Sequence, residues 1–120
     1  MMSALFRDLQ RWVSTTKWSI EGWVTAWRDE KSLRQWVAVN AISWVILIFV
    51  GFSSVEVALL VVLGVLVVIV ELLNSAIETS VDYVSTDRHP LAKKAKDIAS
   101  AAVFVAALLW LAVWMLLLVG

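Results

Sequence analysis

Three long stretches of the chain are almost free of charge, and they restrict its possible folds more than any other feature. Residues 35–55 and 98–120 contain no Asp, Glu, Lys or Arg, and residues 57–77 contain only Glu71. A helix of about 20 apolar residues is long enough to cross the roughly 30 Å hydrocarbon core of a membrane. The sequence therefore predicts three transmembrane helices.

The composition excludes several other classes of protein. Hydrophobic residues make up 62% of the 120 residues, and only 17% are charged. A soluble domain of this size leaves much of its surface in water, so it could not bury so many apolar side chains. The absence of cysteine and the single histidine exclude disulfide frameworks, cysteine-based metal sites and multi-histidine metal sites. We also expect that the chain binds no nucleic acid.

The basic residues predict the orientation in the membrane. All ten Lys and Arg residues lie either between residues 7 and 34 or between residues 88 and 96. Loops that are rich in Lys and Arg remain in the cytoplasm. We therefore expect the N-terminus and the second loop on the cytoplasmic side, and the C-terminus on the outer side.

The first 31 residues are expected to form an amphipathic helix in the membrane interface. Apolar side chains recur there at helical spacing, and no signal-peptide core follows the first charges. The predicted fold is an all-α membrane protein, with this surface helix (1–31) and transmembrane helices at about 33–53, 55–82 and 92–119. The apolar positions of the surface helix are Leu5, Leu9, Trp12, Val13, Ile20, Trp23, Val24 and Trp27.

Two local patterns predict where helices begin. Ser53 and Glu56 have the spacing of a capping box, which would start the second transmembrane helix. Pro90 is the only proline, and proline is tolerated in the first turn of a helix. We therefore expect the third transmembrane helix to begin near Pro90.

One apolar segment carries a stripe of polar side chains. Because each residue turns a helix by roughly 100°, Asn74, Glu78 and Asp82 all lie within about 60° of Glu71. An acidic residue near the membrane centre costs about 2.5–3.5 kcal/mol on insertion scales, so Glu71 is a functional candidate. A solvated helix end is the simpler interpretation of Asp82, and a packing role between helices is an alternative for Asn74.

Carboxylates on one helix face repel each other unless a cation lies between them. The candidate cations are Mg²⁺, which binds one or two carboxylates together with phosphate oxygens, and Lys96, which lies beside Asp97 at the start of the third span. The four glycines are too scattered to form a P-loop or a dinucleotide-binding loop. A bound nucleotide would therefore depend on carboxylate-held Mg²⁺ and on basic side chains.

Three parts of the sequence resemble the small prokaryotic diacylglycerol kinases. Residues 71–78 (ELLNSAIE), followed by Asp82, are similar to the signature of that family, and residues 95–97 with 100–103 are similar to its second block. The resemblance covers roughly residues 11–105. The N-terminal positions that fit the family are Ser19, Gly22, Ala26, Trp27, Glu30, Arg34 and Gln35.

The resemblance implies a single lipid kinase domain over residues 1–120 in the bacterial inner membrane. It also implies a homotrimer with sites shared between protomers, ATP as the phosphoryl donor, Mg²⁺ as the cofactor and diacylglycerol as the lipid substrate. Glu71 would be the general base, Glu30 and Glu78 would hold the metal, and Asn74 and Asp82 would order the site. The implied ATP-binding residues are Arg11, Trp18, Glu30, Glu78, Asp87, His89, Lys96 and Asp97, and the implied lipid-binding residues are Arg11, Ser19, Arg34, Gln35, Glu71 and Ser100.

Three alternatives remain at the level of the sequence. Residues 89–93 resemble the related undecaprenol kinases, and Trp36 stands where family members often carry an acid. A small proton-coupled transporter would also bury an acid such as Glu71, although closer to the middle of the membrane. A non-catalytic membrane scaffold would need no buried acid.

Overall fold

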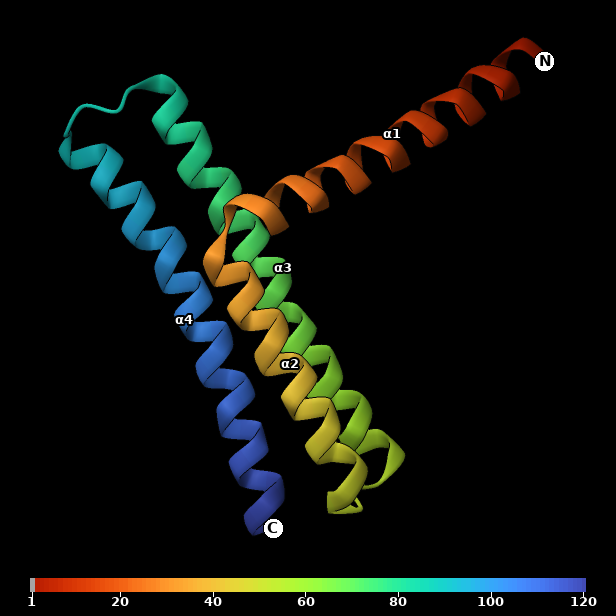
Figure 1. Cartoon of the computed structure of the whole chain (residues 1–120), viewed down its shortest axis with the longest axis vertical. Coiled ribbons are helices and arrows are strands. Elements are labelled where there is room, and N and C mark those ends of the chain that lie inside the picture. The colour runs from red at the N-terminus through yellow and green to blue at the C-terminus, as the bar shows by residue number, and fades with distance from the viewer. Residues whose placement is uncertain (1) are drawn as a thin grey trace. The chain divides into compact units, whose positions relative to one another are not determined.

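The computed structural model describes residues 2–120 as four helices, α1 (Met2–Asp29), α2 (Lys31–Val50), α3 (Ser54–Val84) and α4 (Pro90–Val119) (Figure 1). The helices α2, α3 and α4 are long and apolar enough to cross a membrane. This confirms an all-α chain with three candidate membrane spans. The chain divides into two compact units, here called unit 1 (up to Lys31) and unit 2 (Ser32–Gly120).

Unit 1 consists mainly of the amphipathic helix α1. Its large apolar side chains, such as Leu9, Trp12 and Trp18, are exposed. Trp23 and Trp27 stack one turn apart with their ring centroids separated by 6.2 Å. The apolar residues predicted at helical spacing are thus all exposed on this helix.

Unit 2 is a bundle of α2, α3 and α4 in which α3 and α4 make the closest backbone approach. Successive helices run in opposite directions, so the C-terminal end of α4 lies at the same end of the bundle as the turn between α2 and α3 (Figure 1). Most large apolar side chains outside the small core remain exposed, as expected for helices surrounded by lipid. The core residues are Leu47, Leu60, Val67, Val103, Ala106 and Trp110.

The helix starts of unit 2 follow local sequence signals. The Ser53 hydroxyl accepts a hydrogen bond from the Glu56 backbone N–H (3.3 Å), and the Glu56 carboxylate accepts one from the Ser53 N–H (2.9 Å), so the capping box is confirmed. Gly51 precedes it with φ of 77°, a left-handed conformation that favours glycine. The helix α4 begins at Pro90, as expected, and His89 is its N-cap.

Hydrogen bonds within the apolar part of the bundle connect the helices. The Asn40 amide donates to the backbone carbonyls of Trp36 and of Gly64 on α3, both at 3.0 Å. Trp110 of α4 lies over Gly64, close enough that a Cβ atom on Gly64 would be 2.7 Å from its ring. These contacts link α2, α3 and α4 around one glycine, which the sequence analysis had not identified.

Replacing Gly64 with alanine is expected to destabilise the bundle. The added Cβ would overlap the Asn40 carboxamide oxygen and the Trp110 ring, and overpacking of a core costs about 1–3 kcal/mol. Thermal unfolding in detergent should therefore show a lower Tm for Gly64→Ala. The matched control is Gly22→Ala, because nothing lies within 4 Å of a Cβ at that helical position. Equal Tm values for Gly64→Ala and the unchanged protein would contradict the proposed contact.

Candidate functional site

The polar stripe of α3 runs from a buried to an exposed environment. Glu71 and Asn74 are 4% and 8% exposed, Glu78 is half-buried, and Asp82 is exposed. All four lie on one unbroken helix, so the structure brings them onto one face as the spacing predicts. The stripe thus leads from the apolar part of the bundle to the loop between α3 and α4.

Glu71 has a hydrogen-bonding partner on α2. The Ser32 hydroxyl donates to the Glu71 Oε1 atom at 2.7 Å. A buried carboxylate without a partner is strongly unfavourable, so this contact stabilises the acid inside the bundle. Ser32 was absent from the predicted site residues.

Asn74 and Glu78 form the next step of the stripe. The Asn74 amide donates to the Glu78 Oε1 atom at 3.5 Å, which is a long hydrogen bond. The Asn74 Oδ1 atom is fully buried and has no partner within residues 2–120. This region therefore contains the carboxylate oxygens of Glu78 and the unpaired carbonyl oxygen of the Asn74 side chain.

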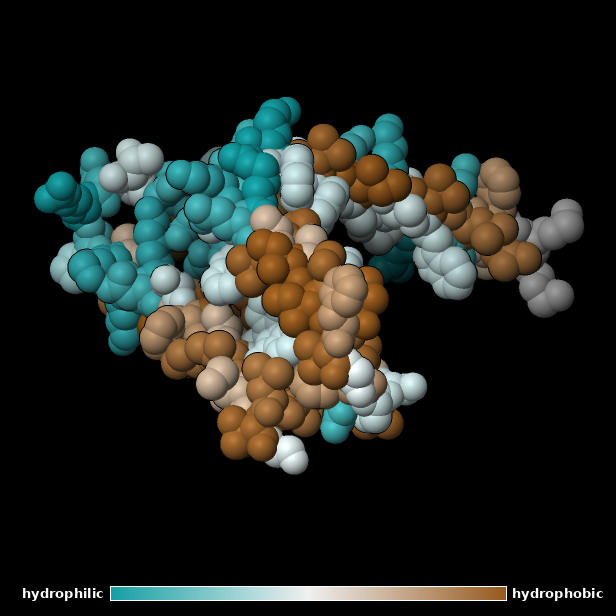
Figure 2. Space-filling model, turned by 60° about the horizontal axis from the view of Figure 1, so that its bottom comes forward, coloured by the Kyte–Doolittle hydropathy of each residue, from teal (hydrophilic) through white to brown (hydrophobic). Residues whose placement is uncertain are grey.

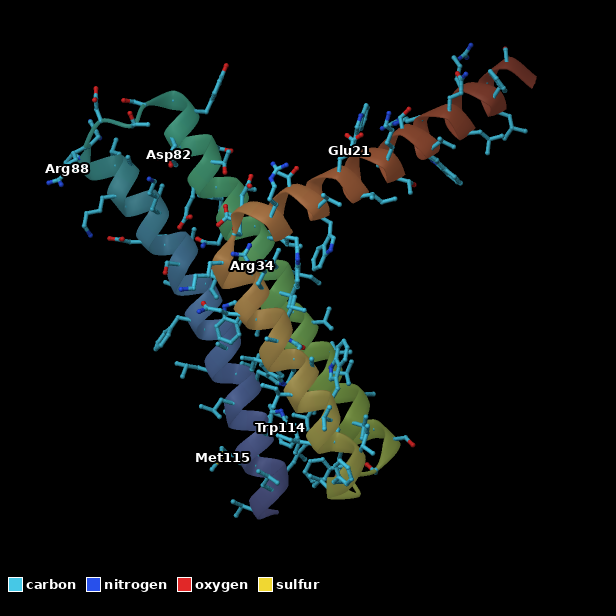
Figure 3. All side chains as sticks on the ribbon, in the orientation of Figure 1. Glu21, Arg34, Asp82, Arg88, Trp114 and Met115 are labelled. Atoms are coloured by element: carbon cyan, nitrogen blue, oxygen red, sulfur yellow. The ribbon has the colours of Figure 1, made fainter. Side chains whose placement is uncertain are left out.

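An open cavity of about 630 Å³ lies at the exposed end of the stripe, near Asp82. It is lined by the end of α3, the start of α4 and the loop that joins them. Figure 3 shows Asp82 and Arg88 at this end of unit 2, and Trp114 and Met115 towards the other end. Hydrophilic residues gather at this end in Figure 2, whereas much of the remaining visible surface of unit 2 is hydrophobic. The predicted residues that line the cavity are Asp82, Asp87, His89, Lys96 and Asp97.

The charged side chains around the cavity largely neutralise one another. Lys96 of α4 binds Asp82 of α3 with 2.6 Å between Nζ and Oδ1, and Lys93 binds Asp97 one turn away on α4. Both pairs are substantially exposed, and ion pairs of this kind contribute little to stability. Their lysines can therefore exchange an aspartate for a phosphate group at little cost.

His89 has a structural role in the same loop. Its Nδ1 atom accepts a hydrogen bond from the Leu91 N–H at 3.1 Å, which caps the first turn of α4. Asp87 is exposed, and its backbone N–H donates to the Ser85 hydroxyl at 3.0 Å. Both residues line the cavity, but the Nδ1 atom of His89 already accepts the Leu91 hydrogen bond.

Three predicted lipid-side residues of unit 2 lie on α2 and α4. Arg34 is half-buried near the start of α2, and Gln35 beside it is exposed. Ser100 is exposed on α4, one turn beyond Lys96. The structure places them on two helices, and their common role stays a prediction.

The remaining predicted residues belong to unit 1. Arg11, Trp18 and Ser19 are exposed on α1, and the Ser19 hydroxyl donates to the Thr15 carbonyl at 2.9 Å. Glu30 is half-buried and is the residue that follows α1 and precedes α2 in the chain. Near it, the hydrogen bond and the charge of Asp29 raise the pKa of Arg28.

No group of three or more His, Asp or Glu side chains within residues 2–120 is arranged to hold a metal ion. The oxygen atoms of Glu78 and Asn74 are nevertheless of the type that Mg²⁺ prefers, and Mg²⁺ completes its shell with water and phosphate oxygens. The local chemistry therefore fits a metal that is shared with a phosphate ligand.

Sequence reasoning missed two contributors to the site. Ser32 is an ordinary small polar residue in a helix turn, so no sequence signal distinguishes it. Lys93 is not among the predicted site residues, but it lines the cavity with Arg88 and forms the pair with Asp97. A cation at a spacing of four residues from Asp97 was the available signal.

Comparisons with known proteins find similarity over most of the chain. A family model described as "Prokaryotic diacylglycerol kinase" matches residues 17–118. A diacylglycerol kinase of Pseudomonas aeruginosa is 43% identical over 112 residues, which cover 93% of this chain and 91% of that protein. The diacylglycerol kinase of Haemophilus influenzae is 37% identical over 85% of this chain and 86% of its own length. The one from Escherichia coli K12 is 35% identical over 90% of this chain and 88% of its own length.

Proposed function

Because the chain belongs to the prokaryotic diacylglycerol kinase family, we propose that it phosphorylates diacylglycerol with Glu71 as the catalytic base. The family is one of ATP-dependent kinases, and this member is a multi-pass membrane protein with three candidate spans. In the reaction, the lipid hydroxyl oxygen bonds to the γ-phosphorus of ATP. The bond from that phosphorus to the bridging oxygen breaks, and ADP and phosphatidic acid are formed.

The burial of Glu71 is the observation that supports this role best. Glu71 is 4% exposed on a helix that is otherwise largely apolar, at the point where the polar stripe begins. A lipid hydroxyl at the membrane boundary reaches such a position without leaving the apolar phase. Glu71 accepts the proton of that hydroxyl as the new phosphorus–oxygen bond forms.

The cavity between α3 and α4 is the proposed position of the ATP phosphates. Lys96 exchanges Asp82 for the phosphates. Asp97 lies beside Lys96 on α4, and Asp87 and His89 belong to the loop that lines the cavity. Phosphoryl transfer depends mainly on positioning and on charge stabilisation, and Lys96 supplies positive charge here. Asn74 and Asp82 order the side chains between this cavity and Glu71.

Mg²⁺ is the proposed cofactor, and Glu78 is its proposed ligand in unit 2. The unpaired Oδ1 atom of Asn74 adds a second oxygen donor beside Glu78. When bound, the metal neutralises charge on the ATP phosphates. Glu30 has the same predicted role through the family resemblance.

The proposal includes an orientation and an assembly. The basic residues favour a cytoplasmic N-terminus and a cytoplasmic loop between α3 and α4, with the C-terminus outside the bacterial inner membrane. The helix α1 would lie in the membrane interface, and the active assembly would be a homotrimer. The unit 1 residues Arg11, Trp18 and Ser19 keep their predicted nucleotide-side and lipid-side roles, as do Arg34, Gln35 and Ser100 in unit 2.

The purified protein is expected to convert diacylglycerol to phosphatidic acid in mixed micelles that contain Mg²⁺ and ATP. Undecaprenol should be offered in the same micelles, because residues 89–93 resemble the undecaprenol kinases. We expect transfer mainly to diacylglycerol, measured with labelled ATP and separation of the lipid products. Transfer mainly to undecaprenol would overturn the proposed substrate, and transfer to neither lipid would overturn the kinase function.

Glu71→Gln is expected to lower kcat by about 10²–10⁴-fold, the usual contribution of a general base. The amide has nearly the same shape as the carboxylate, so folding should be preserved, as checked by gel filtration and thermal unfolding in detergent. Glu56→Gln is the matched control, because glutamine also serves in a capping box at the opposite end of α3. Near-normal turnover of Glu71→Gln would exclude the role as base.

Glu78→Gln is expected to impair the use of Mg²⁺. A neutral amide is a weaker ligand for a hard cation, so the Mg²⁺ concentration for half-maximal activity should rise roughly tenfold or more. The measurement is a Mg²⁺ titration at fixed ATP and lipid, again with Glu56→Gln as the control. If the Mg²⁺ dependence of Glu78→Gln does not change, Glu78 is not a metal ligand.

A further inference from the structure

The hydroxyl of Ser32 is the side-chain partner of the buried Glu71 carboxylate in unit 2. It donates to Oε1 at 2.7 Å across 39 positions of the sequence. Ser32 is half-buried in the first turn of α2, immediately before the fully buried Leu33. Ser32 therefore lies in a packed turn of α2 and not at an exposed helix end.

A second hydrogen bond fixes how α2 and α3 are aligned. Asn40, two turns further along α2, donates to the carbonyl of Gly64, about two turns before Glu71 on α3. Gly64 has no side chain, so Asn40 can approach the backbone of α3 closely. The hydrogen bond of Asn40 sets the alignment of α2 along α3, and in this alignment the Ser32 hydroxyl lies beside Glu71.

The two oxygen atoms of Glu71 are in different situations. Oε1 accepts the Ser32 hydrogen bond. The hydrogen bond of Glu71 within residues 2–120 is at Oε1, and Oε2 is not one of the fully buried atoms without a partner there, which are Asn40 Oδ1, Asn74 Oδ1 and Trp110 Nε1. Oε2 is therefore not fully buried. Oε2 is therefore the oxygen that remains available to a substrate.

We propose that Ser32 is a positioning residue that holds Oε1 and directs Oε2 of Glu71 towards the lipid hydroxyl. This inference rests on the proposed function of Glu71 as the base. A glutamate side chain has three rotatable bonds, and the Ser32 bond removes the freedom of its last one. Ser32 keeps its own proton, so Oε1 retains the same donor before and after Oε2 accepts the proton of the lipid.

The test compares Ser32→Ala with Ser32→Thr, which keeps the hydroxyl. Loss of a hydrogen bond to a charged group should lower kcat of Ser32→Ala roughly 10- to 100-fold. The KM values for ATP and for diacylglycerol should stay unchanged, because the bond orients the base and touches neither substrate. Ser32→Thr should recover most of the turnover. The control is Ser80→Ala, because the Ser80 hydroxyl donates only within its own helix, to the Ala76 carbonyl.

The outcomes separate this inference from the proposed function. Normal kcat in Ser32→Ala together with an inactive Glu71→Gln overturns the role of Ser32 alone. Normal kcat in both variants overturns the base as well. A raised KM without a fall in kcat, or a Ser32→Thr variant as slow as Ser32→Ala, also overturns the positioning role. Ser32→Ala removes a donor from the buried Glu71 carboxylate, so its Tm in detergent should be lower than that of Ser80→Ala, while gel filtration at the assay temperature should still show folded protein. A fall in kcat that only follows the unfolded fraction would overturn the positioning role.

Discussion

The hydrogen bond between Ser32 and Glu71 allows this bundle to keep a carboxylate among apolar helices. A buried acid without a donor would have no compensation for the water that it loses. The contact requires the first turn of α2 and the middle of α3 to meet with their polar side chains facing each other. The placement of both helices is consequently constrained at the position where the proposed chemistry occurs.

The environment of the polar stripe changes steadily along α3, and the proposed functions follow that change. The lipid hydroxyl belongs where the bundle is apolar, and the phosphates of ATP belong where water and cations are available. Glu71 is buried and Asp82 is exposed on the same helix face, so one element connects both environments. The exposed ion pair of Lys96 with Asp82 lies at the polar end, where an anionic ligand can replace a carboxylate at low cost.

The apolar half of the bundle contains its own polar connection. Asn40 donates to the Gly64 carbonyl, and the Trp114 indole donates to the Ser43 hydroxyl at 3.2 Å. In an apolar phase, hydrophobic burial does not distinguish one helix rotation from another, because lipid is as apolar as leucine. Directional contacts of this kind therefore select one rotation of each helix, and they also determine how the helices are aligned at the polar end of the bundle.

Hydropathy and local spacing were sufficient to predict much of this protein. They identified three candidate spans, the capping box at Ser53, the start of α4 at Pro90 and the shared face of Glu71 and Asp82, because each depends on neighbours within one or two helical turns. The contacts of Ser32 with Glu71, Asn40 with Gly64 and Lys96 with Asp82 join positions 39, 24 and 14 residues apart. They depend on the rotation and alignment of whole helices, which side-chain packing between helices sets and which no local pattern encodes. The sequence alone thus determined which residues could carry the chemistry, and the tertiary structure decided which partners hold them.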